Sequence, residues 1–170
     1  MDFDSLYAQY SRLVFWAAYN VTKNRDAAFD VSQEVFLRAL KHQKKLDAMN
    51  DMQLKGWLYR VAVNGSVDML RRGKKELLYD VPPNDGPTDS ECDMPESSAI
   101  RSERDSMLRD SVNALDDIYR EPVLLHYYSG LNYHDIAALL NVAEGTVKSR
   151  MSRAKAMLRT MLGERGMNDE

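Results

Sequence analysis

The sequence predicts an all-α protein made of two small helical bundles joined by a flexible acidic linker. Apolar residues recur with the 3.6-residue period of a helix in both halves of the chain, and no stretch alternates in the way typical of a strand. The periodic pattern dissolves after Gly73 and resumes after residue 100, which predicts two bundles. We place the first bundle at residues 1–73, the linker at 74–100, the second bundle at 101–163 and a tail at 164–170.

Three helices are expected in the first half. The first carries an apolar pattern from Phe3 to Val21 and ends at Thr22-Lys23-Asn24. The second is expected from Asp26 to about Leu46, and the third from about Met52 to Arg72. Three helices with short connections form a compact bundle. The loop from Leu46 to Asp51 could cradle a base extruded from DNA, although a plain connector is the simpler interpretation.

Acidic residues are concentrated in the linker. The chain has a net charge of −3, yet the stretch from Glu76 to Glu96 holds seven acidic and no basic residues. Removing these seven negative charges from −3 leaves +4 for the rest of the chain, so the acid is local. The same stretch contains Pro82-Pro83 and Gly86-Pro87 and few apolar residues, which is typical of a mobile linker.

The second half begins with two apolar segments. Apolar residues spaced from Leu108 to Ile118 start the bundle. A short helix should follow, with Pro122 near its first turn, and Ser129-Gly130 should end it.

A helix-turn-helix is predicted next. Asn132, with Asp135 three residues later, has the form of a capping box, so a short helix should begin there. Asn141-Val142-Ala143 interrupts the pattern, and a second helix from about Glu144 carries six basic and two acidic residues up to Arg165. This second helix is the candidate recognition helix.

The candidate recognition helix has two distinct faces. One is apolar and should pack on the preceding helix: Val147, Met151, Ala154 and Leu158. The opposite face holds Ser149, Ser152 and Arg153, flanked by Lys148 and Arg159. Small residues around one Arg let a helix lie deep in the major groove, where the guanidinium can meet guanine and flanking cations can meet phosphates. The alternative is a surface helix with a solvated basic face.

Two further surfaces lie in the first half. Asp26, Asp30 and Glu34 recur every four residues beside Gln33, and a solvated acidic face accounts for them equally well. On the third helix a polar edge lies off the apolar stripe: Arg60, Asn64, Asp68 and Arg71. Amide and guanidinium groups on such an edge suit unpaired bases, whose hydrogen-bonding edges are free.

Composition and motifs exclude several classes of protein. With 44% apolar and 29% charged residues, the chain is of a globular type, and no apolar run is long enough for membrane insertion. The single Cys92 cannot form an internal disulfide, and with three scattered histidines it does not predict a zinc site. There is no phosphate-binding glycine loop and no nucleophile motif. We expect a cytoplasmic protein that is not an enzyme and has no catalytic residues, metal or cofactor.

Three motifs follow one another in a fixed order. They are Asp30-Val31-Ser32-Gln33-Glu34-Val35-Phe36, then Trp57-Leu58-Tyr59-Arg60-Val61-Ala62-Val63-Asn64, and, after the acidic linker, Gly145-Thr146-Val147-Lys148-Ser149-Arg150. In this order the sequence resembles the sigma-70 family of bacterial RNA polymerase initiation factors. More narrowly, it is similar to the extracytoplasmic function (ECF) group, which keeps only sigma regions 2 and 4. The resemblance covers residues 3–162 apart from the linker.

The resemblance implies partners and a role for each surface. It implies that the protein binds RNA polymerase core, recognises the minus-10 and minus-35 elements of promoter DNA and aids strand opening, and that an anti-sigma factor holds it inactive. Asp30, Gln33 and Glu34 would bind core polymerase. Asn64, Arg71 and Arg72 would contact minus-10 DNA, with Arg60 and Asp68 on the same edge. Lys148, Ser149, Ser152 and Arg153 would read the minus-35 element.

The alternative is a helix-turn-helix transcriptional regulator that acts without being a polymerase subunit. Such a protein needs a sensory or dimerisation half, usually with a ligand pocket or strands, and the first half predicts neither. The two classes differ in one observable property, which is whether the protein gives promoter-specific transcripts when it is added to core polymerase.

Overall fold

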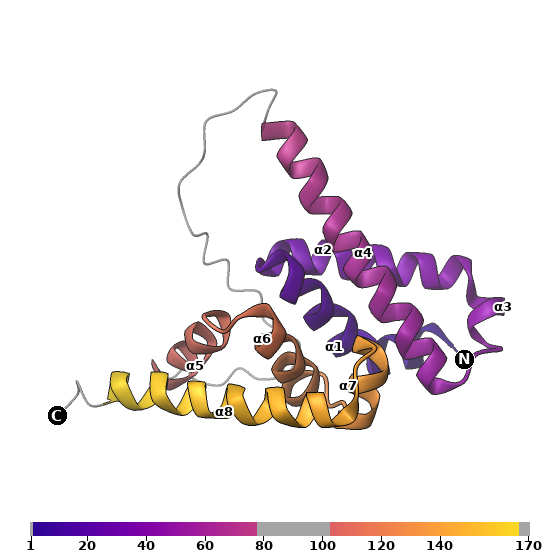
Figure 1. The fold of residues 1–170 in the computed structure, drawn as a ribbon. Helices are drawn as coiled ribbons and strands as arrows, with labels where there is room; N and C mark the ends of the chain where they lie inside the picture. Colours follow the sequence, from indigo (N-terminus) through magenta and orange to yellow (C-terminus); the bar gives the residue numbers. More distant parts are fainter. Residues whose placement is uncertain (1, 78–102, 167–170) are drawn as a thin grey trace. The chain divides into compact units, whose positions relative to one another are not determined.

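The computed structural model describes residues 2–77 and 103–166 (Figure 1). Within these ranges helices are the only regular elements, which confirms the predicted all-α fold class. The chain divides into two compact units, Met1–Ser97 and Ser98–Glu170. Residues 78–100 of the predicted linker and 167–170 of the predicted tail lie outside the described residues.

Unit one is a bundle of α1 (Phe3–Thr22), α2 (Arg25–Lys41) and α4 (Asp51–Leu77), each of which contacts the other two. The side chains of Val14, Ala18, Ala28, Leu58 and Ala62 are completely buried. Alanines at these contacts let the helices approach closely, and each buried Leu or Val stabilises the bundle by about 1.5–3 kcal/mol. The predicted break between the first two helices is confirmed, since Lys23 is left-handed (φ 54°) and Asn24 caps α2.

The second predicted helix is interrupted before its expected end. The prediction of one helix to about Leu46 is wrong, because α2 ends at Lys41 and a separate turn, α3 (Gln43–Leu46), follows. Ala39 and Leu46 are both buried and lie seven residues apart, which is nearly two helical turns. The apolar pattern therefore stays in phase across the break and does not reveal it.

The start of α4 is fixed by two sets of polar contacts. Asn50 and Gln53 form a capping box, in which Asn50 Oδ1 accepts from Gln53 N at 2.8 Å and Gln53 Oε1 accepts from Asn50 N at 3.1 Å. The Tyr10 hydroxyl donates to Asp51 Oδ1 at 2.5 Å, and Lys55 Nζ lies 2.7 Å from Asp51 Oδ2. These contacts tie the end of the connecting loop to α1.

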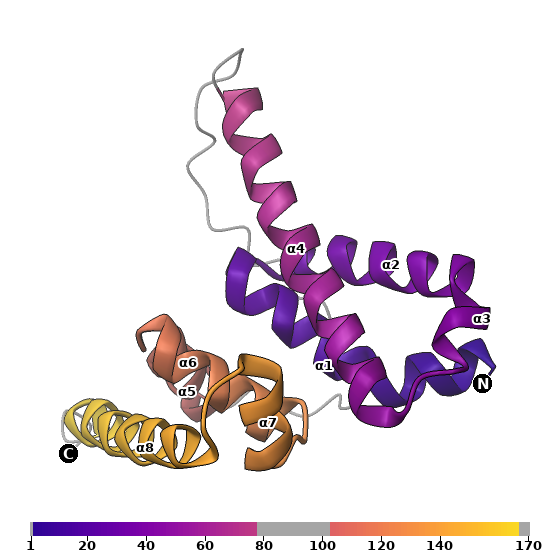
Figure 2. The same cartoon turned by 45° about the vertical axis from the view of Figure 1, so that its right-hand side comes forward.

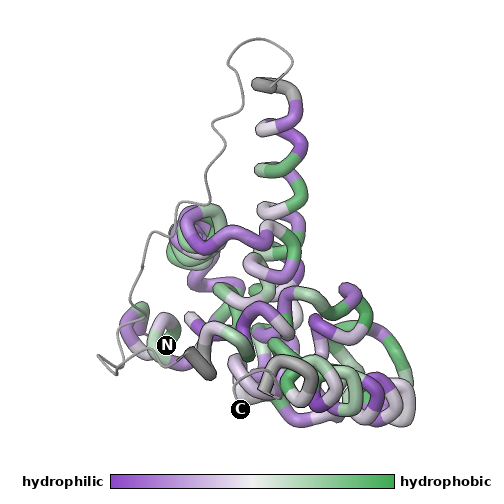
Figure 3. The backbone as a smooth tube through the Cα atoms, turned by 90° about the vertical axis from the view of Figure 1, so that its left-hand side faces the viewer, coloured by the Kyte–Doolittle hydropathy of each residue, from purple (hydrophilic) through white to green (hydrophobic). Residues whose placement is uncertain are grey.

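The third predicted helix is longer than expected. It continues through Gly73 to Leu77, into the segment predicted as linker. Figures 2 and 3 show its C-terminal turns standing clear of the other helices of unit one. A helical Gly costs about 1 kcal/mol relative to Ala, and Lys74, a cation in the last turn of α4, offsets part of that cost.

Unit two packs its other elements against the long helix α8 (Glu144–Gly166). These are α5 (Glu103–Asn113), α6 (Asp117–Val123) and α7 (Tyr133–Leu140), and a π-helical turn, η1 (Leu124–Tyr128), contacts α6 and α7. The apolar stripe predicted for α8 is confirmed at Val147, Met151 and Ala154, which are at most 1% exposed, while Leu158 is only half-buried. Two residues of the predicted apolar pattern, Leu108 and Ile118, are instead exposed.

The corner between α5 and α6 is held by Arg120, whose side chain is only 2% exposed. Its Nη1 donates to the carbonyls of Asn113 and Leu115 at 3.2 and 2.8 Å, and its Nη2 pairs with Asp117. Carbonyls at a helix end lack partners within the helix, so this guanidinium satisfies groups that burial would otherwise leave unpaired.

Pro122 lies deeper in its helix than expected. It is the sixth residue of α6, not part of the first turn, and it is buried. Proline has no N–H and so removes one helical hydrogen bond. The chain then widens into η1, where Ser129 N bonds to Leu124 O, five residues back, at 3.1 Å. Gly130 ends the segment with φ +74°, which confirms the predicted stop at Ser129-Gly130.

The helix-turn-helix prediction is confirmed. Asn132 Oδ1 accepts from Asp135 N at 2.8 Å and so caps α7. Asn141 ends α7 in the left-handed region (φ 54°), where its N–H bonds to Ala137 O, and α8 begins at Glu144. Asn tolerates this conformation better than other non-glycine residues, so the turn matches its sequence.

Candidate protein and nucleic-acid binding surfaces

The predicted acidic residues of α2 lie on its surface. Asp30 and Gln33 are exposed, and Glu34 is half-exposed, with Oε1 2.5 Å from Arg38 Nη2. Leu37 and Leu40, one to two turns further along, are 59% and 43% exposed. The apolar pattern of the second predicted helix places Leu40 on its inward face, and this prediction is wrong, while Leu37 lies outside that pattern. The surface therefore combines carboxylates and an amide with large apolar side chains.

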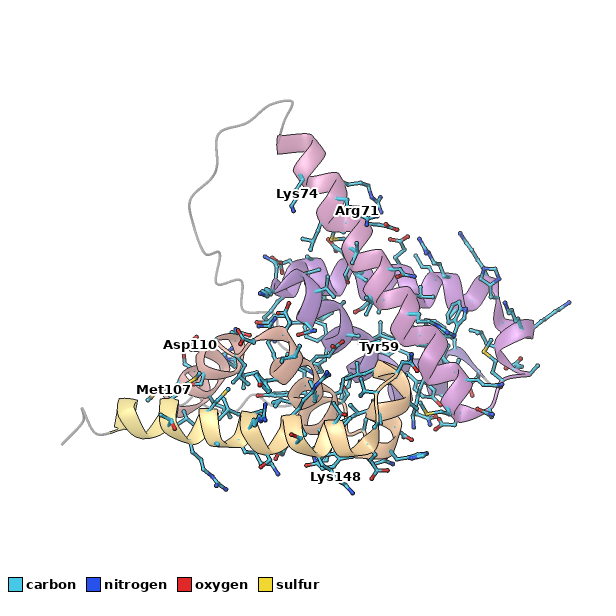
Figure 4. All side chains as sticks on the ribbon, in the orientation of Figure 1. Tyr59, Arg71, Lys74, Met107, Asp110 and Lys148 are labelled. Atoms are coloured by element: carbon cyan, nitrogen blue, oxygen red, sulfur yellow. The ribbon has the colours of Figure 1, made fainter. Side chains whose placement is uncertain are left out.

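The predicted polar edge of α4 is also exposed. Its members are Arg60, Asn64, Asp68, Arg71 and Arg72. Figure 4 shows Arg71 and Lys74 on the part of α4 that extends beyond the bundle. Leu58 and Ala62 on the opposite side are completely buried, so packing fixes the direction in which the edge faces. Amide, carboxylate and guanidinium groups are thus held in a line along one rigid helix.

A cavity of about 390 Å³ lies beside the loop that precedes α4. Leu40, Leu46 and Met49 give it an apolar wall, while Tyr10 and Asp51 line it with polar groups. Hydrogen bonds from Lys55 and then Tyr10 lower the pKa of Asp51 below its usual value, so this carboxyl is ionised at neutral pH. Burial, and then the bond to Asp51, raises the pKa of Tyr10, so this hydroxyl stays protonated. The cavity walls come from three distant parts of the sequence, which is why periodicity did not predict it.

The predicted reading face of α8 is exposed on the side opposite its packed stripe. Lys148, Ser149, Ser152 and Arg153 all face outward. Figure 4 shows Lys148 projecting away from the helix. Lys148 Nζ lies 3.3 Å from Glu144 Oε1, and His134 Nδ1 of α7 lies 3.7 Å from Glu144 Oε2. Exposed pairs of this kind contribute about 0–1 kcal/mol, so Lys148 can readily exchange its partner for a phosphate.

Among the residues that the structure describes, no group of three His, Cys, Asp or Glu side chains could hold a metal ion. None of the described helices is both long and apolar enough to cross a membrane.

Comparisons with known proteins identify the family of the chain. The family "Sigma-70 region 2" matches residues 6–76, and "Sigma-70, region 4" matches residues 105–158. The ECF RNA polymerase sigma factor SigM of Bacillus subtilis is 31% identical over the full length of both chains. SigW of the same organism is 29% identical over 90% of this chain and 84% of its own length.

A similar fold occurs among solved structures. The sigma factor RpoE of Bartonella quintana, solved in complex with the anti-sigma factor NepR, has a TM-score of 0.63 and 27% identity, covering 94% of this chain and 97% of its own. Region 2 followed by region 4 defines a sigma factor of the sigma-70 type. The chain belongs to the ECF group of the sigma-70 family. It is therefore a transcription initiation factor that directs RNA polymerase to promoters, and the free-standing regulator is not favoured.

Proposed function

We propose that the protein recognises promoters at two points, as a subunit of RNA polymerase in the cytoplasm and without catalysis of its own. Unit one docks on core polymerase through Asp30, Gln33 and Glu34 and holds the opened minus-10 strand against α4. Unit two reads the minus-35 duplex with α8. The observation that supports this most directly is the α8 face, on which exposed small and basic side chains lie opposite the buried Val147, Met151 and Ala154.

The dimensions of α8 suit a major groove. The groove of B-DNA is about 12 Å wide and admits an α-helix. Ser149 and Ser152 are small enough for close approach, and Arg153 between them can present its fork to the O6 and N7 atoms of guanine. Lys148 would exchange its weak pairing with Glu144 for a DNA phosphate.

The minus-10 contacts are assigned to α4 and to the cavity beside it. Asn64 and Arg71 lie seven residues apart, so they share one face about 10.5 Å apart along the helix axis. The cavity volume falls within the range of small-ligand pockets, about 300–1,000 Å³. Extruded bases are held by apolar stacking and by polar groups at their edges, and the cavity offers both. This supports the interpretation of the Leu46 to Asp51 loop as a base cradle.

An anti-sigma factor is proposed as a further partner. RpoE of Bartonella quintana, which resembles this chain along nearly its whole length, was solved bound to such a factor. On unit one, the exposed Leu37 and Leu40 beside the acidic residues offer apolar area that a protein partner could bury. A factor covering this surface would compete directly with core polymerase.

Transcription in vitro tests the proposed function. Core polymerase supplemented with the protein should initiate at a defined set of sites on a library of random promoters, and the selected sites should share two spaced elements. Core polymerase alone is the control. Initiation that stays as dispersed as in the control would contradict the proposal.

Arg153 is expected to determine which base is preferred at one position of the minus-35 element. Arg153→Ala should cost about 1–3 kcal/mol at the preferred minus-35 sequence and relax the preference at one position, because a bidentate contact with guanine would be lost. Binding of the polymerase complex to a panel of single-base minus-35 variants measures both effects. A loss of equal size on every variant would instead assign Arg153 to phosphate.

A further inference from the structure

We propose that the cavity beside Asp51 selects an extruded base that carries an exocyclic amino group, which donates to the Asp51 carboxylate, and discriminates against thymine. The inference rests on the proposed capture of a minus-10 base in this cavity. It adds the chemical class of that base, which is cytosine, adenine or guanine, and the residue that distinguishes this class from thymine.

The charged side chains that line the cavity are carboxylates. Asp47 and Asp51 belong to the lining, and none of the described residues that line it is a cation. An ionised carboxylate accepts hydrogen bonds but cannot donate them. Cytosine, adenine and guanine each carry an amino group that donates, whereas thymine has acceptor oxygens on both sides of its one ring N–H. The amides of Gln9 and Gln43, also in the lining, can donate or accept and so suit either class of base.

Two contacts hold Asp51 as an acceptor. The Tyr10 hydroxyl donates its single hydrogen to Asp51 Oδ1 at 2.5 Å, so this phenol cannot also donate to a base. Lys55 Nζ lies 2.7 Å from Asp51 Oδ2, and Lys55 is not part of the cavity lining. Each carboxylate oxygen has two lone pairs, so Asp51 can accept a further hydrogen bond. Its side chain is 55% exposed, which lets an incoming base reach it.

The short helix α3 separates the cavity from cations outside it. Gln43 and Leu46 line the cavity, whereas Lys44 and Lys45 of the same turn are exposed and do not line it. The carboxylates inside repel a phosphate and the ammonium groups outside attract one, so a nucleotide enters with its base first. Leu46 and Met49 form an apolar wall, and a hydrogen bond made beside such a wall is stronger than one made in water.

Base analogues test the inference on the complex of core polymerase with the full-length protein. The promoter duplex is mismatched over its minus-10 segment, so that the cost of strand opening does not enter. Each base of one strand is replaced in turn by its counterpart without the amino group: cytosine by pyrimidinone, adenine by purine and guanine by hypoxanthine. At one position this replacement, and thymine likewise, should weaken binding at least about tenfold, because a hydrogen bond to a charged group is lost.

Asp51→Asn should reduce the loss at that position to about threefold or less. The side chain keeps its size, but a neutral amide replaces the charged acceptor and can itself donate to thymine. Asp4→Asn is the matched control, because it removes a carboxylate of α1 that does not line the cavity, and it should leave the tenfold loss unchanged. Circular dichroism checks that both variants keep their helix content.

The outcomes separate this inference from the proposed function. Equal binding of every base and its amino-free counterpart would overturn the inference, and this arm needs only the unaltered protein. A loss that stays undiminished in Asp51→Asn would assign recognition to another group and overturn it as well. An abasic nucleotide placed at each position then decides the rest. If it weakens binding, the proposed capture of a base remains; if it has no effect at any position, that capture is overturned too.

Discussion

Reversing the charges of Asp30 and Glu34 is expected to abolish association of the protein with core polymerase. Each Asp or Glu to Lys change turns an anion on the proposed docking surface into a cation. Like charges brought together at an interface cost several kcal/mol, and each 1.4 kcal/mol is a factor of ten in affinity. The loss for Asp30→Lys/Glu34→Lys should therefore exceed about a hundredfold.

The fold should survive this double change. Glu34 is ion-paired with Arg38, both side chains are nearly half exposed, and an exposed pair four residues apart on a helix contributes about 0.3–0.5 kcal/mol. Circular dichroism should show unchanged helix content, while co-elution with core measures association. Asp4→Lys/Asp110→Lys is the matched control, because it reverses two exposed carboxylates outside every proposed surface. Core binding retained by the folded Asp30/Glu34 variant would remove the docking assignment.

The isolated protein should bind promoter duplex at least about a hundredfold more weakly than its complex with core. Non-specific and specific binding of DNA by one protein differ in affinity by a factor of that order or larger. Phosphate neutralisation supplies much of the affinity for duplex, and few cations line the proposed DNA-facing side of α8: Lys148, Arg153, Lys155 and Arg159. The chain also carries seven carboxylates from Glu76 to Glu96, which compete for the same cations. Separating the strands costs about 1.4 kcal/mol per base step, and two small helical units have few contacts to offset it.

A mobility-shift titration at physiological salt measures this difference, with and without core. Core polymerase alone is the control for binding that does not depend on the protein, and permanganate reactivity of unpaired thymines reports opening. Tight sequence-specific binding of duplex by the isolated protein would favour the free-standing regulator over the assignment to a polymerase subunit.

Helices with a long apolar period could be predicted from the sequence. The pattern from Phe3 to Val21 is sustained over five turns and predicts α1 closely. The helix-turn-helix could be predicted because Asn132 and Asn141 carry the side-chain chemistry that helix ends require. In each case the information is local, within one or two turns of the residue concerned.

Features that depend on tertiary contacts could not be predicted. The break after Lys41 is hidden because the buried residues on both sides of it remain in phase. The π-turn after Pro122 cannot be recognised from the 3.6-residue spacing of apolar residues. From the sequence alone, Arg120 would be taken for an exposed cation. Its hydrogen-bond partners are backbone carbonyls of a corner that forms only in the folded structure.

The candidate sites also divide into those that could be predicted from the sequence and those that depend on tertiary contacts. The exposure of Asp30, Asn64 and Arg153 follows from helical phase, and the structure agrees with it. The cavity beside Asp51 needs Tyr10 from α1 and Leu40 from α2. Sites assembled from several elements become visible only when those elements are placed in space.

The unbroken length of α4 fixes the distance between the cavity beside Asp51 and the basic end of the helix, both of which we propose to contact minus-10 DNA. Its 27 residues span about 40 Å, and Asp51 beside the cavity is separated from Arg72 by about 31 Å. One residue inserted after Asn64 would turn the basic end by about 100° and put its guanidinium groups out of phase with the rest of the polar edge. Seven inserted residues would restore the phase and move the basic end about 10.5 Å further from the cavity.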